Sequence, residues 1–69
     1  MRATVIRHSL SRISPSEIIS LRTALGETQE QFGRRFNRCL KTVFYWEANM
    51  RRPDPFVITA MRRLQAQVM

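Results

Sequence analysis

Apolar residues recur at helical spacing in four stretches of the chain, and turn-forming residues separate these stretches. In the first stretch, Ile18, Leu21 and Leu25 follow one another at intervals of three and four residues, which places them on one face of a helix. The preceding run Ser14-Pro15-Ser16-Glu17 supplies a serine N-cap, a proline at the first helical position and a glutamate at the third. The pattern therefore predicts a first helix that ends at Gly26.

The second stretch predicts a short helix with one aromatic face. Thr28 is a suitable N-cap, and Gln31 stands where a capping-box side chain reaches back to the cap. Phe32 and Phe36 are four residues apart, so they share a face that must be buried. Gly33 lies between them, where the lack of a side chain lets another backbone approach closely.

The third stretch predicts another short helix after a tight turn. Asn37 is expected to end the second helix and Asn49 the third, because asparagine tolerates the left-handed backbone conformation. The third helix runs from about residue 40 to 48. Its expected inward positions are Leu40, Val43, Trp46 and Glu47, and its expected outward positions are Lys41, Thr42, Phe44, Tyr45 and Ala48. Phe44 and Tyr45 are large apolar side chains on the expected outer face, and contact with base edges or with a protein partner would cover them. In the alternative, the helix is rotated by one position and Phe44 is buried in the core.

The fourth stretch predicts a last helix from about Pro55 to Gln67, opened by Asp54. Its apolar residues are Phe56, Val57, Ile58, Ala60, Met61, Leu64 and Val68. They are more than one inward stripe requires, so part of this helix is expected to remain apolar on the outside. We therefore expect a symmetric homodimer through this helix, either alone or together with the N-terminal segment.

Length and charge narrow the class of protein. A chain of 69 residues allows one domain with a small core. The formal charge is +7, the sequence pI is about 11.6, and eleven of the twelve cationic residues are arginines. This balance predicts a polyanionic partner, of which nucleic acid is the most common. The planar guanidinium of arginine also favours contacts of defined geometry with phosphate or guanine over nonspecific electrostatic attraction.

Residues 1–13 form an N-terminal arm or strand in this interpretation, and residues 14–69 form the domain. Thr4, Val5 and Ile6 suit a short strand or an extended arm, and the flanking arginines would let an arm follow a DNA groove. A solvated, partly disordered end is the alternative. The segment is also rich in Arg and Ser and free of acids, a composition that mitochondrial presequences share.

Catalysis and metal binding are not expected. One His, one Asp and one Cys make no catalytic triad, paired-carboxylate site or metal cluster. Cys39 is interpreted as a small, half-buried residue, with a redox-sensitive thiol as the alternative. No cofactor is expected, and no apolar run reaches the length of a membrane span. The sequence thus predicts a soluble, cytoplasmic protein that is not an enzyme.

The central part of the chain resembles the Xre/Cro family of helix-turn-helix proteins, which includes phage repressors and the DNA-binding parts of bacterial antitoxins. The resemblance covers about Ser14 to Pro53 and rests on Leu21, Arg22, Leu25, Gly26, Thr28-Gln29-Glu30, Phe32, Phe36, Thr42-Val43, Trp46-Glu47 and Arg51-Arg52-Pro53. It implies an all-α, four- to five-helix bundle of the lambda-repressor-like type with a central helix-turn-helix. The chain departs from the family at the turn, where Asn37 and Arg38 replace the usual Gly and apolar residue, and at Cys39, which replaces a capping Ser.

An ion pair and a location also follow from the resemblance. In the family an arginine at the position of Arg22 commonly pairs with the glutamate of the Trp-Glu motif, which implies an Arg22–Glu47 ion pair; two solvated side chains are the alternative. The resemblance places the protein near the nucleoid of a bacterial or phage-infected cell.

The function expected from these observations is sequence-specific binding to double-stranded DNA by a dimeric transcriptional repressor. Thr28 and Gln29, at the amide end of the second helix, would meet one phosphate, and Arg51 and Arg52 would hold the DNA backbone on the far side. Base reading through the major groove falls to the helix over residues 40–48, by way of Lys41, Thr42, Phe44 and Tyr45. Arg38 would reach a base or a phosphate, whereas Arg34 and Arg35 are interpreted as a solvated face.

Two other functions stay open. An antitoxin-type protein would neutralise a toxin partner and regulate its own operon, although little of the chain lies outside the DNA-binding part. A basic binder of RNA or of membrane surfaces is the third hypothesis. It is disfavoured because the aromatic residues lie on a short helical motif rather than on a stacking sheet or a long amphipathic helix.

Overall fold

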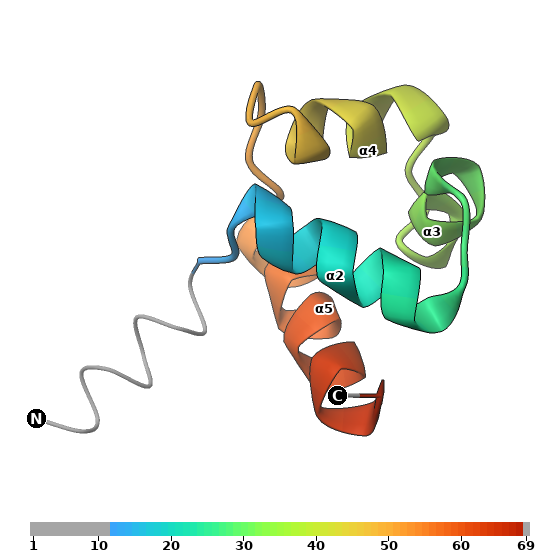
Figure 1. The fold of residues 1–69 in the computed structure, drawn as a ribbon. Coiled ribbons are helices and arrows are strands. Elements are labelled where there is room, and N and C mark those ends of the chain that lie inside the picture. Colours follow the sequence, from blue (N-terminus) through green and yellow to red (C-terminus); the bar gives the residue numbers. More distant parts are fainter. Residues whose placement is uncertain (1–11, 69) are drawn as a thin grey trace, which may run out of the picture.

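A computed structural model describes residues 12–68 and shows four helices without strands in that range (Figure 1). The helices are α2 (Pro15–Leu25), α3 (Gln29–Arg35), α4 (Leu40–Glu47) and α5 (Pro55–Val68). The prediction of a small all-helical bundle is confirmed at this level. The predicted strand or arm with Thr4, Val5 and Ile6 lies outside the described residues.

The helices begin where the sequence places their caps. Both α2 and α3 carry a complete capping box, in which the Ser14 hydroxyl accepts from the Glu17 amide at 3.2 Å and the Thr28 hydroxyl accepts from the Gln31 amide at 3.1 Å. The Asp54 carboxylate accepts from the Val57 amide at 2.9 Å and so caps α5. Each cap satisfies an N–H group that has no partner inside its helix.

The predicted stops are also present. Gly26, Asn37 and Asn49 have φ values of 69°, 59° and 60°, which lie in the left-handed region. Glycine and asparagine adopt this conformation at the lowest cost, so the chain can reverse direction directly after α2, α3 and α4.

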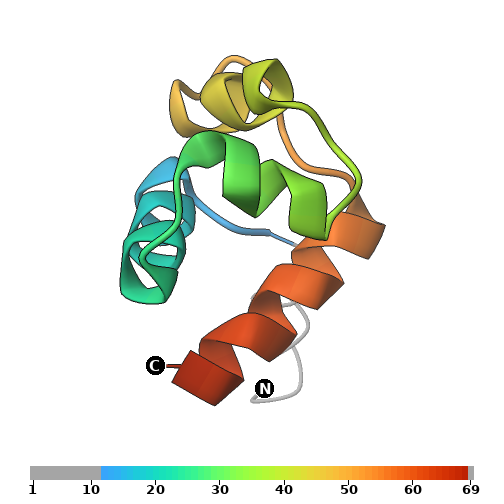
Figure 2. The same cartoon turned by 90° about the vertical axis from the view of Figure 1, so that its right-hand side faces the viewer.

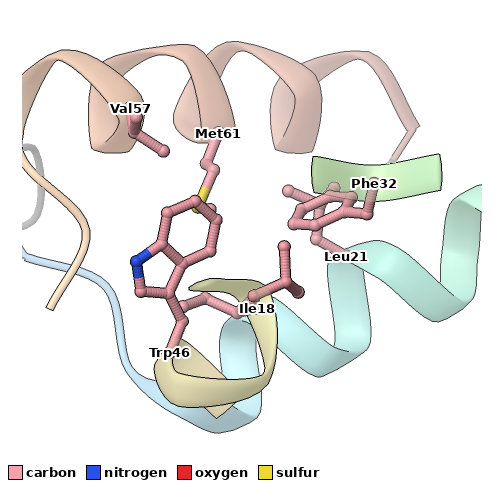
Figure 3. Packing of buried hydrophobic residues seen from close by; sticks show 7 residues of the cluster. Ile18, Leu21, Phe32, Trp46, Val57 and Met61 are labelled. Atoms are coloured by element: carbon pink, nitrogen blue, oxygen red, sulfur yellow. The ribbon is translucent and has the colours of Figure 1, made fainter. Parts of the chain in front are cut away.

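The core lies between α2, α4 and α5, with Phe32 entering from α3 (Figure 3). Helix α2 packs against both α4 and α5, and α3 packs against α4. The buried cluster consists of Ile18, Leu21, Phe32, Val43, Trp46, Val57 and Met61. Phe36 is half-buried against this cluster and meets Phe32 and Trp46 edge to face, with ring centroids 5.1 and 6.3 Å away.

Gly33 allows a close approach between α3 and the turn that follows it. A Cβ atom at this position would lie 2.7 Å from the carbonyl oxygen of Arg38 and 3.0 Å from a Val43 methyl carbon. The turn between α3 and α4 therefore lies directly on the face of α3, as the sequence predicted. Only glycine leaves room for it.

Two burial predictions were wrong. Leu40 was expected to face inward but is 48% exposed. Residues three apart on a helix drift by about 60° per step, so the line from Trp46 through Val43 has moved off the core by Leu40. Cys39 was expected to be half-buried and is exposed, because it stands outside α4 as its N-cap.

Helix α5 has the surplus of apolar residues that the sequence suggested. Val57, Ile58 and Met61 are buried, whereas Phe56 is 84% exposed and Val68 is 42% exposed. The inward stripe of α5 is thus complete without Phe56.

Candidate nucleic-acid interface

Helices α3 and α4 are joined by the short connection over residues 36–39. The Gly33 carbonyl accepts hydrogen bonds from the Phe36 and Arg38 amides at 3.0 and 2.9 Å, which closes the turn after α3. Figures 1 and 2 place α4 at one end of the molecule, with α5 extending toward the other end. The outer face of α4 is therefore not covered by the rest of the described chain.

That outer face combines one cation with two aromatic rings. Lys41 and Phe44 are exposed, Phe44 by 49%, while Thr42 and Tyr45 are half-buried. The rings of Phe44 and Tyr45 lie side by side, with centroids 6.0 Å apart. The predicted alternative in which Phe44 enters the core was wrong.

The loop after α4 folds back onto the helix. With Asn49 in the left-handed conformation, the amides of Met50 and Arg51 donate to the Tyr45 carbonyl at 2.9 and 3.3 Å. The Arg51 guanidinium then lies 5.5 Å from the centroid of the Tyr45 ring, within cation–π range. These bonds hold Arg51 beside the outer face of α4.

The inner end of α4 is fixed by the Arg22–Glu47 ion pair, which confirms the prediction. Arg22 Nε and Nη2 donate to the two carboxylate oxygens of Glu47 at 2.6 and 3.1 Å, and only 8% of the Glu47 side chain is exposed. The hydrogen bond to Glu47 raises the pKa of Arg22, so the guanidinium stays charged. Arg22 also donates to the Glu27 carbonyl at 3.0 Å, which ties the α2–α3 turn to the same group.

Gln29 contributes to this inner network through its side chain. Its Nε2 atom donates to Glu47 Oε1 at 3.0 Å, a contact that the sequence analysis missed. The side chain is therefore held inside the molecule, and only the first-turn amides of α3 and the exposed Thr28 remain for a phosphate. The Thr-Gln-Glu motif alone did not indicate this contact, because predicting it requires knowing that α3 packs against α4.

Arg38 is tied into the fold instead of extending outward. Its guanidinium donates to the carbonyls of Phe36 and Asn37 at 3.0 and 3.3 Å and to Asp54 Oδ2 at 2.9 Å. The predicted direct DNA contact of Arg38 is therefore not supported by its geometry, because its donors serve the α3–α4 turn and the start of α5. The capping bond from the Val57 amide, followed by the contact with Arg38, lowers the pKa of Asp54.

Every acidic residue of the chain is paired with an arginine. The pairs are Glu17–Arg62, Glu27–Arg35, Glu30–Arg34, Glu47–Arg22 and Asp54–Arg38. The charges of Arg34 and Arg35 are thus partly neutralised. The sequence analysis predicted only that these two residues form a solvated face, without naming their partners. The Glu30–Arg34 spacing of four residues was a readable signal for one of these pairs.

Five cations within residues 12–68 have no ion-pair partner among those residues. They are Arg12, Lys41, Arg51, Arg52 and Arg63. Lys41, Arg51 and Arg52 are exposed and lie on α4 or in the loop that follows it. Within residues 12–68, three of the five unpaired cations therefore lie on α4 or directly after it, and Arg51 is one that contacts the aromatic outer face.

Neither a metal cluster nor a membrane-spanning helix occurs in the described part of the chain. Across residues 12–68 no three His, Cys, Asp or Glu residues gather in a way that would hold a metal ion. Within the same range no helix has the length and apolar character required to cross a bilayer.

The comparisons with known proteins add no relative. No protein-family model matches the chain, and no curated protein or solved structure matches it at a significant level.

Proposed function

We propose that this protein is a sequence-specific regulator of transcription that binds double-stranded DNA with α4 in the major groove. The observation that carries the proposal is the distribution of charge: each carboxylate is bound by an arginine, and three of the five unpaired cations within residues 12–68, namely Lys41, Arg51 and Arg52, lie on α4 or in the loop after it. A compact helix that presents a lysine and two aromatic rings beside unpaired arginines suits a groove lined with phosphates.

The contacts divide into reading and positioning. Lys41 donates to guanine, Thr42 reaches a base edge, and Phe44 and Tyr45 pack against thymine methyl groups. Arg51 and Arg52 hold the DNA backbone on one side of α4, while Thr28 and the first-turn amide of Gln29 meet a phosphate on the other. Arg38 acts as a positioning residue, since it connects the α3–α4 turn to Asp54 at the start of α5.

The regulator acts as a homodimer and blocks transcription. The surplus apolar surface of α5, with Phe56 84% exposed, supplies a face for a second copy. A two-fold dimer would read a pseudo-palindromic operator with half-sites about 34 Å apart, one turn of the double helix. Such a protein works in the cytoplasm of a bacterial or phage-infected cell. The antitoxin alternative would place a toxin on this same apolar surface.

Selection from random duplex DNA at moderate salt tests the proposal. We expect enrichment of a two-fold symmetric sequence, and Lys41→Ala and Tyr45→Ala should abolish the enrichment while circular dichroism shows an intact helical fold. Arg63→Ala is the matched control, because it removes an exposed, unpaired cation on α5, away from α4. Binding that shows no sequence preference and only weakens as salt rises would refute sequence reading and leave backbone attraction alone.

A further inference from the structure

A groove of about 540 Å³ lies behind the proposed DNA-binding loop. It is bounded by residues 12–15 before and at the start of α2, by the α4–α5 loop, and by the first turns of α5. The volume falls within the range of small-molecule sites in proteins. A domain of this size thus contains a cavity, and part of its lining, Arg51 and Arg52, also belongs to the proposed contact with DNA.

The floor of the groove is apolar and contains one hydrogen-bond donor. Ile18, Trp46, Pro53 and Ile58 line it and are buried in the fold. The Trp46 indole N–H makes no hydrogen bond within residues 12–68, and because no fully buried side-chain nitrogen in that range lacks a partner, this N–H keeps some contact with solvent. Figure 3 agrees, since the indole nitrogen lies on the side of the ring away from Leu21 and Phe32.

The rim of the groove is strongly basic. Arg12, Arg51, Arg52 and Arg62 line it together with a single carboxylate, that of Glu17. Arg62 binds Glu17 at 2.8 Å and also donates to the Arg12 carbonyl, so this pair closes one side of the groove. The other three arginines have no carboxylate partner among the described residues.

We propose that this groove binds a small organic anion with an apolar body, such as an aryl or alkyl carboxylate. The apolar body would lie against Trp46 and Ile58, and the carboxylate would accept from the indole N–H and from the unpaired arginines of the rim.

Occupation of the groove regulates DNA binding, a consequence that rests on the proposed function. Arg51 and Arg52 line the groove and are also the residues assigned to the DNA backbone. An anion in the groove holds these guanidinium groups and lowers the local positive charge. The anion and the DNA phosphates therefore compete for the same two side chains.

Binding is tested on the whole chain without DNA by ¹⁵N NMR titration. The probe is 6-phenylhexanoate, and its uncharged match is 6-phenylhexanamide; acetate supplies the carboxylate without the apolar body. The chain has one tryptophan, so a single indole N–H signal reports on the floor of the groove. We expect that signal to move with 6-phenylhexanoate, and neither the amide nor acetate to bind comparably. Equal binding of the amide, or no movement of the Trp46 signal, would overturn the proposal.

Charge-matched variants locate the site. Arg52→Gln and Arg12→Gln each remove an unpaired rim arginine, and the loss of one charge-assisted hydrogen bond should raise the probe Kd by roughly tenfold. Arg63→Gln removes an unpaired arginine that does not line the groove and should leave the Kd unchanged. An equal rise in the probe Kd for all three variants would mean that the probe responds only to the net charge of the protein, which would contradict a specific site in the groove.

The regulatory part has a separate readout. We expect 6-phenylhexanoate at saturating concentration to weaken binding to a selected DNA duplex by about tenfold, with the amide inactive. Lys41→Ala should lose DNA binding and keep the probe Kd, since Lys41 does not line the groove. Probe binding without any selectable DNA would refute the proposed function and leave the ligand site standing, whereas DNA binding that ignores the bound probe would refute the competition.

Discussion

Helix α4 has two faces that use charge in opposite ways. On the inner face Glu47 is almost fully buried and is held by Arg22 from α2 and Gln29 from α3. On the outer face Lys41 is exposed and has no ion-pair partner within residues 12–68. The inner charge fixes the position of the helix, and the outer charge remains available for a partner. Substitutions on the two faces should accordingly affect different measurements.

The largest effect is expected from breaking the inner ion pair. Glu47→Ala leaves the Arg22 guanidinium partly buried without its carboxylate, which should lower the free energy of unfolding by about 3 kcal/mol. Glu30→Ala is the control, because its pair with Arg34 is exposed and should be worth about 0.5 kcal/mol or less. Urea unfolding of both variants measures the difference. Similar losses in the two would show that the Arg22–Glu47 pair is no more important than a surface pair.

Gly33→Ala should be the next most damaging change. The added methyl group would meet the Arg38 carbonyl at 2.7 Å, and backbone cannot move aside as easily as a flexible side chain. We expect a loss of about 1–3 kcal/mol, in the range of an overpacked core. Gly26→Ala provides the comparison: it has free space but a positive φ, so its cost of about 1 kcal/mol should come from backbone strain. Thermal unfolding would contradict this account if Gly33→Ala were the milder variant.

On the outer face, Phe44→Ala should leave stability almost unchanged and impair DNA binding. The side chain is half-exposed and lies outside the buried cluster, so a change within about 0.5 kcal/mol in unfolding free energy is expected. Affinity for the selected operator should fall by about 1–3 kcal/mol if Phe44 packs on thymine methyl groups. A gel-shift titration beside the unfolding curve separates the two effects. A marked loss of stability with unchanged affinity would reverse the assignment of the two faces.

Most of the fold could be predicted from single residues and their spacing. Ser14, Thr28 and Asp54 mark the helix starts, and Gly26 and Asn37 mark stops, because caps and left-handed residues act within a few positions of the chain. Helix starts and stops of this kind can therefore be predicted without knowing how the helices pack.

The candidate site was less predictable because it depends on side chains that meet across the fold. Arg38 reaches Asp54 sixteen residues away, and Gln29 reaches Glu47 eighteen residues away. No short-range pattern indicates such contacts. The groove behind Trp46 was likewise absent from the sequence analysis, since it is formed by residues 12–15, the α4–α5 loop and the start of α5 together.

A smaller effect is expected from restoring an oxygen at the start of α4. Cys39 is the N-cap and makes no side-chain capping bond; its sulfur instead contacts the Thr42 hydroxyl at 3.4 Å. Cys39→Ser should raise the melting temperature modestly, because a hydroxyl can accept from a first-turn amide of α4. Cys39→Ala is the control and should not raise it. An equal rise in both variants would point to removal of the thiol instead of capping.

The smallest expected effect is the pH response of Glu17, which closes one side of the groove. The hydrogen bond from Arg62, followed by that from the Ser14 backbone, lowers its pKa below the ordinary value of 4.5. Because the pKa is lower in the native state, ionised Glu17 stabilises the fold at pH values above the ordinary pKa. This stabilisation is lost as the pH falls through the native pKa. The side chain is 41% exposed, so solvent screening keeps the contribution to a few tenths of a kcal/mol. Melting temperatures measured downward from pH 6 should fall on acidification, and the fall should be shallower in Glu17→Gln. The fall in melting temperature that remains in Glu17→Gln should include the contribution of Asp54, whose pKa is also lowered. Parallel curves for the two proteins would show that Arg62 does not hold Glu17 in the folded protein.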